Sequence, residues 1–234
     1  MCLKRVLGVA ALCVASSATA QEWDWKIAPY LWGAGIQGDM TVREHTAAVD
    51  VEFSEILNVL AGAAIVHVEG GTEHHVLLAD LVWMRLEPED VETAGGSAEA
   101  EFDSTILELG YRRASDGPSL ELGIRYWDME IGIDPPQLES RTRGASWTDG
   151  WIGIRFDPKL GDHWTLTVRA NAGAGGSDST LGASAQFRRR LESGNELIAG
   201  FKALSVDYSE GGNGNNRVGL DSSFMGTTVG FAFD

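Results

Sequence analysis

Alternation of apolar and polar residues with a period of two dominates this chain after residue 22. About ten stretches show the pattern, and each is about long enough to cross a bilayer as a tilted strand. In the clearest stretch, residues 74–84, Leu77, Leu81 and Trp83 alternate with a second set that includes Leu78 and Asp80. The connections between the stretches alternate between short and long. This pattern is typical of a transmembrane β-barrel, in which only every second residue faces lipid.

The pattern predicts an all-β fold: an antiparallel, up-and-down transmembrane barrel of about ten strands. Tight turns are expected at residues 70–71, 115–118, 158–161 and 192–195, where Gly, Pro, Asn and Asp gather. Most longer loops fall between these turns, so an even strand number brings both ends of the chain to one side. In the first strand, expected over Trp23–Ile36, Pro29 predicts a local irregularity because it cannot donate to a ladder.

The first long connection, after Gly38, is acidic and contains one stretch with helical spacing. Ile56, Leu57 and Leu60 share a face there, which predicts a short helix over Ser54–Leu60 with Ser54 as its cap. The helix is therefore expected in the first outer loop. Its position over the mouth, in the lumen or on the membrane is left open by the sequence.

The first twenty residues are interpreted as a secretory signal peptide, with Lys4 and Arg5 before an apolar run and a small-residue site at 18–20. Residues 21–234 then form the barrel domain. Both cysteines lie inside the leader, so the mature chain is expected to lack thiol chemistry. The mature part carries 16 basic and 34 acidic side chains, a formal charge of −18, which argues against nucleic-acid binding.

Aromatic residues gather at one end of the expected strands and predict a girdle at a membrane interface. With the first strand starting in the periplasm, this girdle marks the periplasmic rim. Its members are Trp25, Tyr111, Phe156, Trp164, Phe187 and Phe233.

Several short motifs spread over the mature chain resemble a family of small, largely uncharacterised proteobacterial outer membrane β-barrel proteins. They include Pro29-Tyr30-Leu31-Trp32, residues 53–57, 78–81, 123–128, 147–149 and 206–208. The resemblance implies a barrel in the cell outer membrane. It brings no catalytic residues with it. One departure concerns insertion, because such barrels usually finish on an aromatic residue and here Asp234 follows Phe233.

The residues assigned to the inner face collect opposite charges. A ten-stranded barrel has room inside for side chains rather than a wide water channel, and buried charges need partners. We therefore expect a salt-bridged lumen, with a solute or ion path as the alternative. The expected lumen charge network comprises Lys26, Asp80, Glu108, Arg112, Glu121, Arg125, Asp149, Arg155, Arg169 and Lys202.

Enzyme and cofactor motifs give little support. Residues 33–38 match a dinucleotide pattern by letter but leave a strand without a following helix, and no Gly-x-Ser-x-Gly elbow occurs. His74 and His75 are strand neighbours that point to opposite faces, and the pair His67 and Glu69 is assigned no metal or base role. We expect no catalytic, cofactor-binding or metal residues. The acidic stretches 50–55 and 87–92 could bind divalent cations that bridge to lipopolysaccharide, since carboxylates suit such ions.

These observations favour a monomeric outer membrane barrel with a plugged polar lumen. Its role is structural or in surface interaction, or at most that of a narrow channel. Its expected partners are outer membrane lipid, lipopolysaccharide and the barrel assembly machinery. The first alternative is an outer membrane enzyme that modifies lipid A or phospholipid, although His45 has no obvious serine partner. The second is a soluble periplasmic barrel with an apolar ligand, which would require Arg125 and Glu108 on the outer wall.

Overall fold

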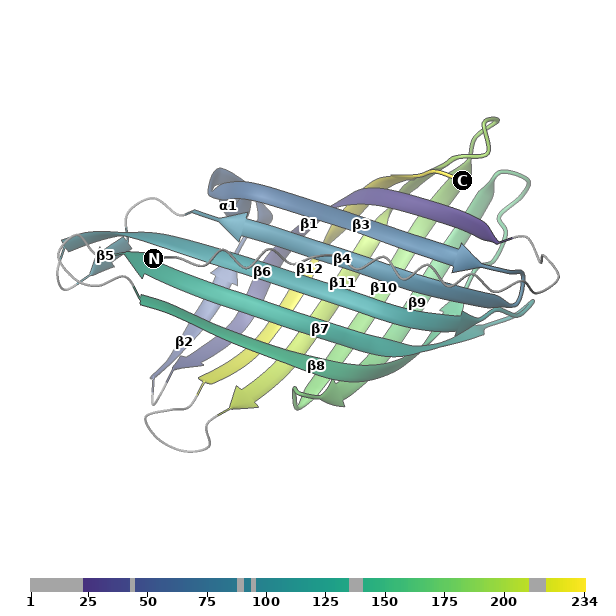
Figure 1. Cartoon of the computed structure of the whole chain (residues 1–234). Coiled ribbons are helices and arrows are strands. Elements are labelled where there is room, and N and C mark those ends of the chain that lie inside the picture. The colour runs from purple at the N-terminus through teal and green to yellow at the C-terminus, as the bar shows by residue number, and fades with distance from the viewer. Residues whose placement is uncertain (1–22, 43–44, 88–90, 94–95, 135–140, 211–217) are drawn as a thin grey trace, which may run out of the picture.

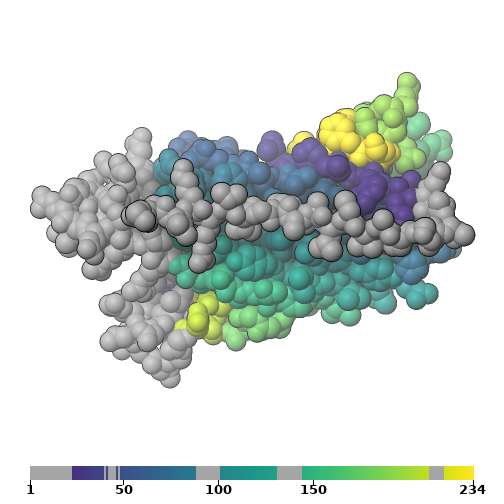
Figure 2. Space-filling model, viewed as in Figure 1, coloured from purple at the N-terminus to yellow at the C-terminus, as the bar shows by residue number. Residues whose placement is uncertain are grey.

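Ten long antiparallel strands close into a single barrel (Figure 1). The computed structural model describes residues 23–42, 45–87, 91–93, 96–134, 141–210 and 218–234, so the expected signal peptide lies outside the described part. The barrel strands are β1 (Asp24–Val42), β3 (Leu60–Gly71), β4 (His75–Leu86), β6 (Gly96–Arg113), β7 (Ser119–Asp134), β8 (Arg141–Phe156), β9 (Trp164–Gly175), β10 (Ser179–Arg190), β11 (Glu196–Glu210) and β12 (Val218–Ala232). Pairing of β1 with β12 completes the cylinder, which is longer along its axis than across it (Figure 2).

The predicted faces are confirmed by the burial of alternate residues along the strands. In β7, Leu122 and Ile124 are 54% and 50% exposed, whereas Glu121 and Arg125 are both 1% exposed. The outer face therefore carries the apolar belt and the interior carries the charges. This arrangement is the reverse of what a soluble barrel with an apolar ligand requires.

The two ends of the barrel differ in their connections. Four tight turns, which follow β3, β6, β8 and β10, lie at the same end as the start of β1 and the end of β12. We call this the turn end and the opposite one the loop end. Three of the predicted turns are confirmed, whereas the one expected at residues 70–71 was wrong, because both glycines end β3 and the turn lies at 72–74. Five exposed members of the girdle, Trp25, Phe156, Trp164, Phe187 and Phe233, lie near the turn end.

The stretch after Gly38, expected to be a loop, is largely a hairpin. β1 continues to Val42 and pairs with a short strand, β2 (His45–Val51), so the expected end of the first strand at Ile36 was wrong. Alternating, partly β-branched residues in β2 favour an extended strand, and this signal was overlooked. A second short strand, β5 (Val91–Thr93), pairs with β6 in the Glu-rich connection. His45, expected in an outer loop, begins β2.

Pro29 marks a real change in the sheet. Pairing of β1 with β3 runs from Asp24 only as far as Pro29, which lies opposite Val66, whereas pairing with β12 continues to Val42. Because proline lacks an amide hydrogen, it suits a position where a ladder ends. The predicted irregularity is therefore the point at which β1 and β3 separate.

The predicted helix is present as α1 (Phe53–Asn58), and its expected cap was wrong. Glu52 rather than Ser54 stands at the N-terminus, and its backbone N–H donates to Glu55 Oε2 at 2.9 Å. The Phe53 ring lies on the outward side of Gly33, where an added Cβ would come within 3.1 Å of it. α1 therefore packs outside the wall, beyond the point where β1 and β3 separate. No helix among the described residues is long and apolar enough to cross a membrane.

The apolar belt gives a prediction about stability in a bilayer. Leu122→Arg places a charge in the middle of the belt and should destabilise the barrel by about 2–4 kcal/mol. The matched change Glu130→Arg lies on the outer face of the same strand beyond the belt and should cost about 0–1 kcal/mol. Urea unfolding in lipid vesicles measures both, and equal effects would contradict the assignment of the belt.

Candidate functional site in the barrel lumen

A continuous chain of ion pairs fills the middle of the lumen. Arg125 donates to Glu108 from both Nε and Nη2, at 3.0 and 2.6 Å. Arg169 then bridges Glu108 to Glu121, and Arg112 Nη1 lies 3.6 Å from Glu121 Oε1. The chain therefore alternates in sign, which is how buried charges avoid the cost of lying unpaired.

Glu69 joins this chain to the turn end. Its carboxylate accepts hydrogen bonds from Arg112, at 3.1 and 2.7 Å, and from Arg155. Arg155 also donates to Asp157 from Nε, at 3.0 and 2.8 Å. Glu69 was left out of the expected network, although it shares the inner face with His67 and its alternation could have identified it.

A second cluster surrounds Asp80. Tyr30 Oη donates to Asp80 at 2.9 Å, and Lys202 Nζ donates both to Tyr30 Oη at 2.7 Å and to Asp80 at 3.1 Å. His67 lies between two carboxylates, with Nδ1 3.1 Å from Asp80 and Nε2 3.0 Å from Glu69. His67 thus links the Asp80 cluster to Glu69, and its neighbours are acids rather than a hydroxyl nucleophile.

Two members of the expected network lie apart from the main chain. Lys26 pairs with Glu196 at 2.8 Å and with Asp234 at 3.2 Å, near the turn end. Asp149 is fully buried, but its carboxylate accepts from Trp147 Nε1 at 3.2 Å and from the backbone of Ser177 at 2.8 Å. Asp149 therefore holds the β9–β10 connection against the wall, and it enters no ion pair with the described side chains. The other eight expected residues lie in the two linked clusters.

Glycines on two neighbouring strands make room for a lumen tryptophan. A Cβ at Gly110 or at Gly123 would come within 2.7 Å of the Trp151 ring. The Arg169 guanidinium lies 4.8 Å from the centre of the same ring. Small residues here thus allow the indole to lie flat beneath the ion-pair chain and support Arg169 by a cation–π contact.

The loop-end half of the lumen is apolar and aromatic. Trp147 stacks on Trp127, with ring centres 5.5 Å apart, and on Tyr208, at 4.1 Å. Phe224 approaches Trp127 from β12, on another part of the wall. We call this set the aromatic cluster, which consists of Trp32, Ile106, Trp127, Trp147, Leu204, Val206, Tyr208 and Phe224. Trp127 was assigned to the interior from the sequence, but the cluster as a unit was not foreseen.

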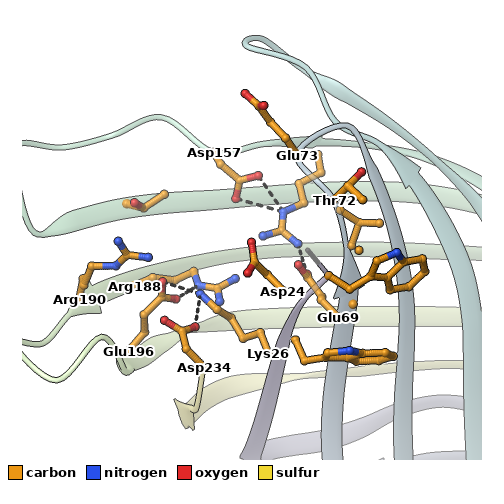
Figure 3. Close-up of a pocket in the computed structure, with 17 residues that line it drawn as sticks. Asp24, Lys26, Glu69, Thr72, Glu73, Asp157, Arg188, Arg190, Glu196 and Asp234 are labelled. Carbon is orange, nitrogen blue, oxygen red and sulfur yellow. Dashed lines mark hydrogen bonds and ion pairs between the residues drawn. The ribbon is translucent and has the colours of Figure 1, made fainter. Parts of the chain in front are cut away.

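A cavity of about 700 Å³ opens at the turn end, and we call it the vestibule (Figure 3). Lys26, Arg188, Glu196 and Asp234 lie together on one side of it, and Arg188 Nε donates to Glu196 at 2.7 Å. Glu69 and Asp157 lie on another side. The vestibule shares four lining residues with a deeper cavity of about 70 Å³: Lys26, Glu69, Arg155 and Arg188.

The cavities become smaller toward the centre of the barrel. The 70 Å³ cavity shares Asp80, Arg169 and Lys202 with a third one of about 30 Å³. Ile106 and Leu204 of the aromatic cluster line this innermost space. Three cavities that share lining residues therefore lie in succession between the turn end and the aromatic cluster.

Metal binding has no geometric support in the described part of the chain. There, no group of three or more His, Cys, Asp or Glu side chains is arranged to hold a metal ion. The stretch 50–55, expected to bind divalent cations, lies on β2 and α1, and the stretch 87–92 is only partly described. Divalent-cation binding at either stretch stays a prediction.

Comparison with known proteins finds similarity among solved structures alone. No protein-family model and no curated protein matches the chain. Among solved structures, the chain is similar to Ail, the attachment invasion locus protein of Yersinia pestis, solved in complex with the heparin analogue sucrose octasulfate. The match has a TM-score of 0.43 and 9% identity, and it covers 90% of this chain and 98% of Ail.

The ion-pair chain gives a prediction about stability. Glu108→Gln removes the charge that Arg125 and Arg169 share and should destabilise the barrel by about 3–5 kcal/mol, because it takes the carboxylate partner from the buried Arg125 and leaves Arg169 with Glu121 alone. The control Glu101→Gln removes one acid of the exposed pair with Arg85, where both side chains are more than 40% exposed. Its cost should be about 0–1 kcal/mol. Urea titration of both variants measures the difference, and a neutral Glu108→Gln would show that the chain does not stabilise the wall.

Proposed function

We propose that this protein is an outer membrane β-barrel with a closed lumen, which anchors and presents its loop end at the cell surface rather than conducting solutes. The observation that carries the proposal is the stack of Trp127, Trp147 and Tyr208 across the lumen. Apolar rings in van der Waals contact exclude water, and ions do not cross such a barrier readily.

The outer wall supports the membrane location. Leu31, Leu120, Ile152 and Val229 belong to four different strands, and each is at least 60% exposed. A continuous apolar surface of this kind is costly in water and is satisfied by lipid. The expected signal peptide and the resemblance to outer membrane barrels agree with this location.

The strands also continue beyond the apolar belt at the loop end. Outward positions there change from apolar to acidic, with Asp128 and Glu130 on β7 and Asp207 on β11, all exposed. An acidic surface outside the hydrocarbon is solvated without penalty. These extensions are the part of the molecule that we propose to be available for surface interactions, with the turn end in the periplasm.

The closed lumen predicts negligible conductance in planar bilayers. The variant Trp127→Ala/Trp147→Ala removes two stacked rings and should produce current steps, because the space left then joins the cavities at the turn end. Trp164→Ala, on the outer face, should stay silent and controls for the loss of an indole. Steady steps from the unaltered protein would instead establish a narrow channel.

The location predicts two properties of the mature protein in a fractionated envelope. It should be found with the outer membrane, and its gel mobility should change on boiling because a closed barrel resists detergent until heated. A soluble periplasmic protein run in the same fractions controls for leakage. An unshifted species in the soluble fraction would refute the membrane proposal.

A further inference from the structure

At the loop end, the strands of the barrel extend to different distances. β1 continues past the barrel wall to Val42 and β6 begins as far out as Gly96, whereas β3 begins at Leu60 and β4 ends at Leu86. β2 pairs with the outer part of β1, and β5 pairs with the outer part of β6 (Figure 1). β2 thus lies on the side of β1 that β3 occupies nearer the turn end.

β2 has one free edge among the described strands, because it pairs with β1 alone. The Oγ1 atoms of Thr41 and Thr46 lie 2.9 Å apart across the hairpin. Facing side chains come this close in a non-hydrogen-bonded pair, in which the backbone groups of the two residues point away from each other. Thr41 and Thr46 therefore form such a pair. Non-hydrogen-bonded pairs alternate with hydrogen-bonded pairs along an antiparallel ladder. The backbone N–H and C=O groups of Thr46, Ala48 and Asp50 therefore all point away from β1.

This free edge lacks several of the usual protections against strand pairing. Natural edges are protected by proline, by charged side chains and above all lysine, by short length, by a bulge or by a covering element. β2 contains neither proline nor lysine, and its register with β1 is uninterrupted from Val51 to His45. Thr46, Ala48 and Asp50 are all exposed. Within the part of the chain that the structure describes, no strand pairs with this edge, so it can accept an added strand.

The charge around β2 determines which kind of strand can bind to its free edge. Asp50 lies on β2, Asp39 stands opposite Ala48 on β1, and Asp221 of β12 stands opposite Asp39. All three are exposed, and like charges directly across a sheet repel each other. A second copy of β2 would bring another Asp50 to the same place. A strand that carries lysine or arginine would instead offset the repulsion.

We propose that β2 binds an extended, basic segment of an extracellular partner protein by strand addition. Backbone hydrogen bonds to Thr46, Ala48 and Asp50 supply affinity, and the aspartates select a cationic side-chain row. This inference rests on the proposed function, since the loop end must lie outside the cell to meet such a partner.

The test uses the refolded full barrel in detergent micelles and a fluorescent seven-residue peptide of alternating lysine and valine. Anisotropy should show binding, and the same peptide with alternate backbone nitrogens methylated should bind at least about threefold more weakly, because it keeps its charge but loses hydrogen-bond donors. Equal binding of the two peptides would overturn strand addition and leave only charge attraction.

Two substitutions at one position test the edge itself. Ala48→Pro removes an outward N–H and should weaken peptide binding at least about threefold, whereas Ala48→Val keeps the N–H and should bind as the unaltered protein does. Unchanged gel mobility before boiling shows that both variants fold. Asp39→Asn/Asp50→Asn should weaken binding and reduce its dependence on salt. If Ala48→Pro binds the peptide normally, β2 is not the site.

Sedimentation and surface labelling complete the design. A dimer that Ala48→Pro abolishes would show that a second copy occupies the edge, and this would overturn the basic partner. Ala48→Cys on intact cells, treated with a membrane-impermeant maleimide, tests the orientation separately. Failure of labelling with retained peptide binding would refute the proposed function, whereas labelling without peptide binding would refute only the strand addition.

Discussion

Closure of the sheet is the constraint on which the rest of this structure depends. In hydrocarbon no water is present to satisfy backbone N–H and C=O groups, so a spanning sheet must leave no edge. Pairing of β1 with β12, from Tyr30 opposite Gly230 to Val42 opposite Val218, closes the cylinder. Beyond Pro29 the other side of β1 leaves β3, and first α1 and then β2 lie along it. Once the cylinder is closed, each strand has one outer face, which lies against lipid in the location that we propose, and one face for the lumen. Every charged residue within the belt then has to lie inside.

The lumen follows from that confinement. Arginines and glutamates on different strands are brought close together in a narrow cylinder, and each carboxylate is shared. Glu108 binds Arg125 and Arg169, and Glu69 binds Arg112 and Arg155. Toward the loop end the inner face changes from ionic to aromatic, and the rings pack against one another. The ionic half leaves cavities that open at the turn end, so the two halves of one lumen differ in open space as well as in charge.

The two ends of the barrel serve different needs. At the turn end the connections are tight and the lumen opens into the vestibule. At the loop end the strands extend beyond the apolar belt. There α1 packs on the outside of β1, and β2 adds a free edge next to exposed aspartates. In the location that we propose, these extensions lie beyond the belt, so hydrocarbon does not force their backbone groups to be paired and an unpaired edge is tolerated there.

The alternation in the sequence was sufficient for the barrel, its ten strands and their faces, because a period of two is imposed by the pleat of every strand. Clusters of Gly, Pro, Asn and Asp located three of the four tight turns. Leu122 and Arg125 could be assigned to opposite faces without any coordinates. The extent of β1 and the presence of β2 and β5 were not foreseen, since short strands outside the belt lack the demand for an apolar face that makes the alternation clear. The position of α1 was also left open, because six residues with one buried side chain, Ile56, do not specify what they pack against.

The sequence by itself thus determined which side chains enter the lumen, because that choice is local to each strand. Only the tertiary structure decided which of them meet. The distance along the chain between Glu69 and Arg155, or between Lys202 and Tyr30, says nothing about their contact, which is set by how the strands are offset around the closed cylinder. For the same reason Asp149 could be placed inside correctly while its partners, the Trp147 indole and the backbone of Ser177, could not be predicted.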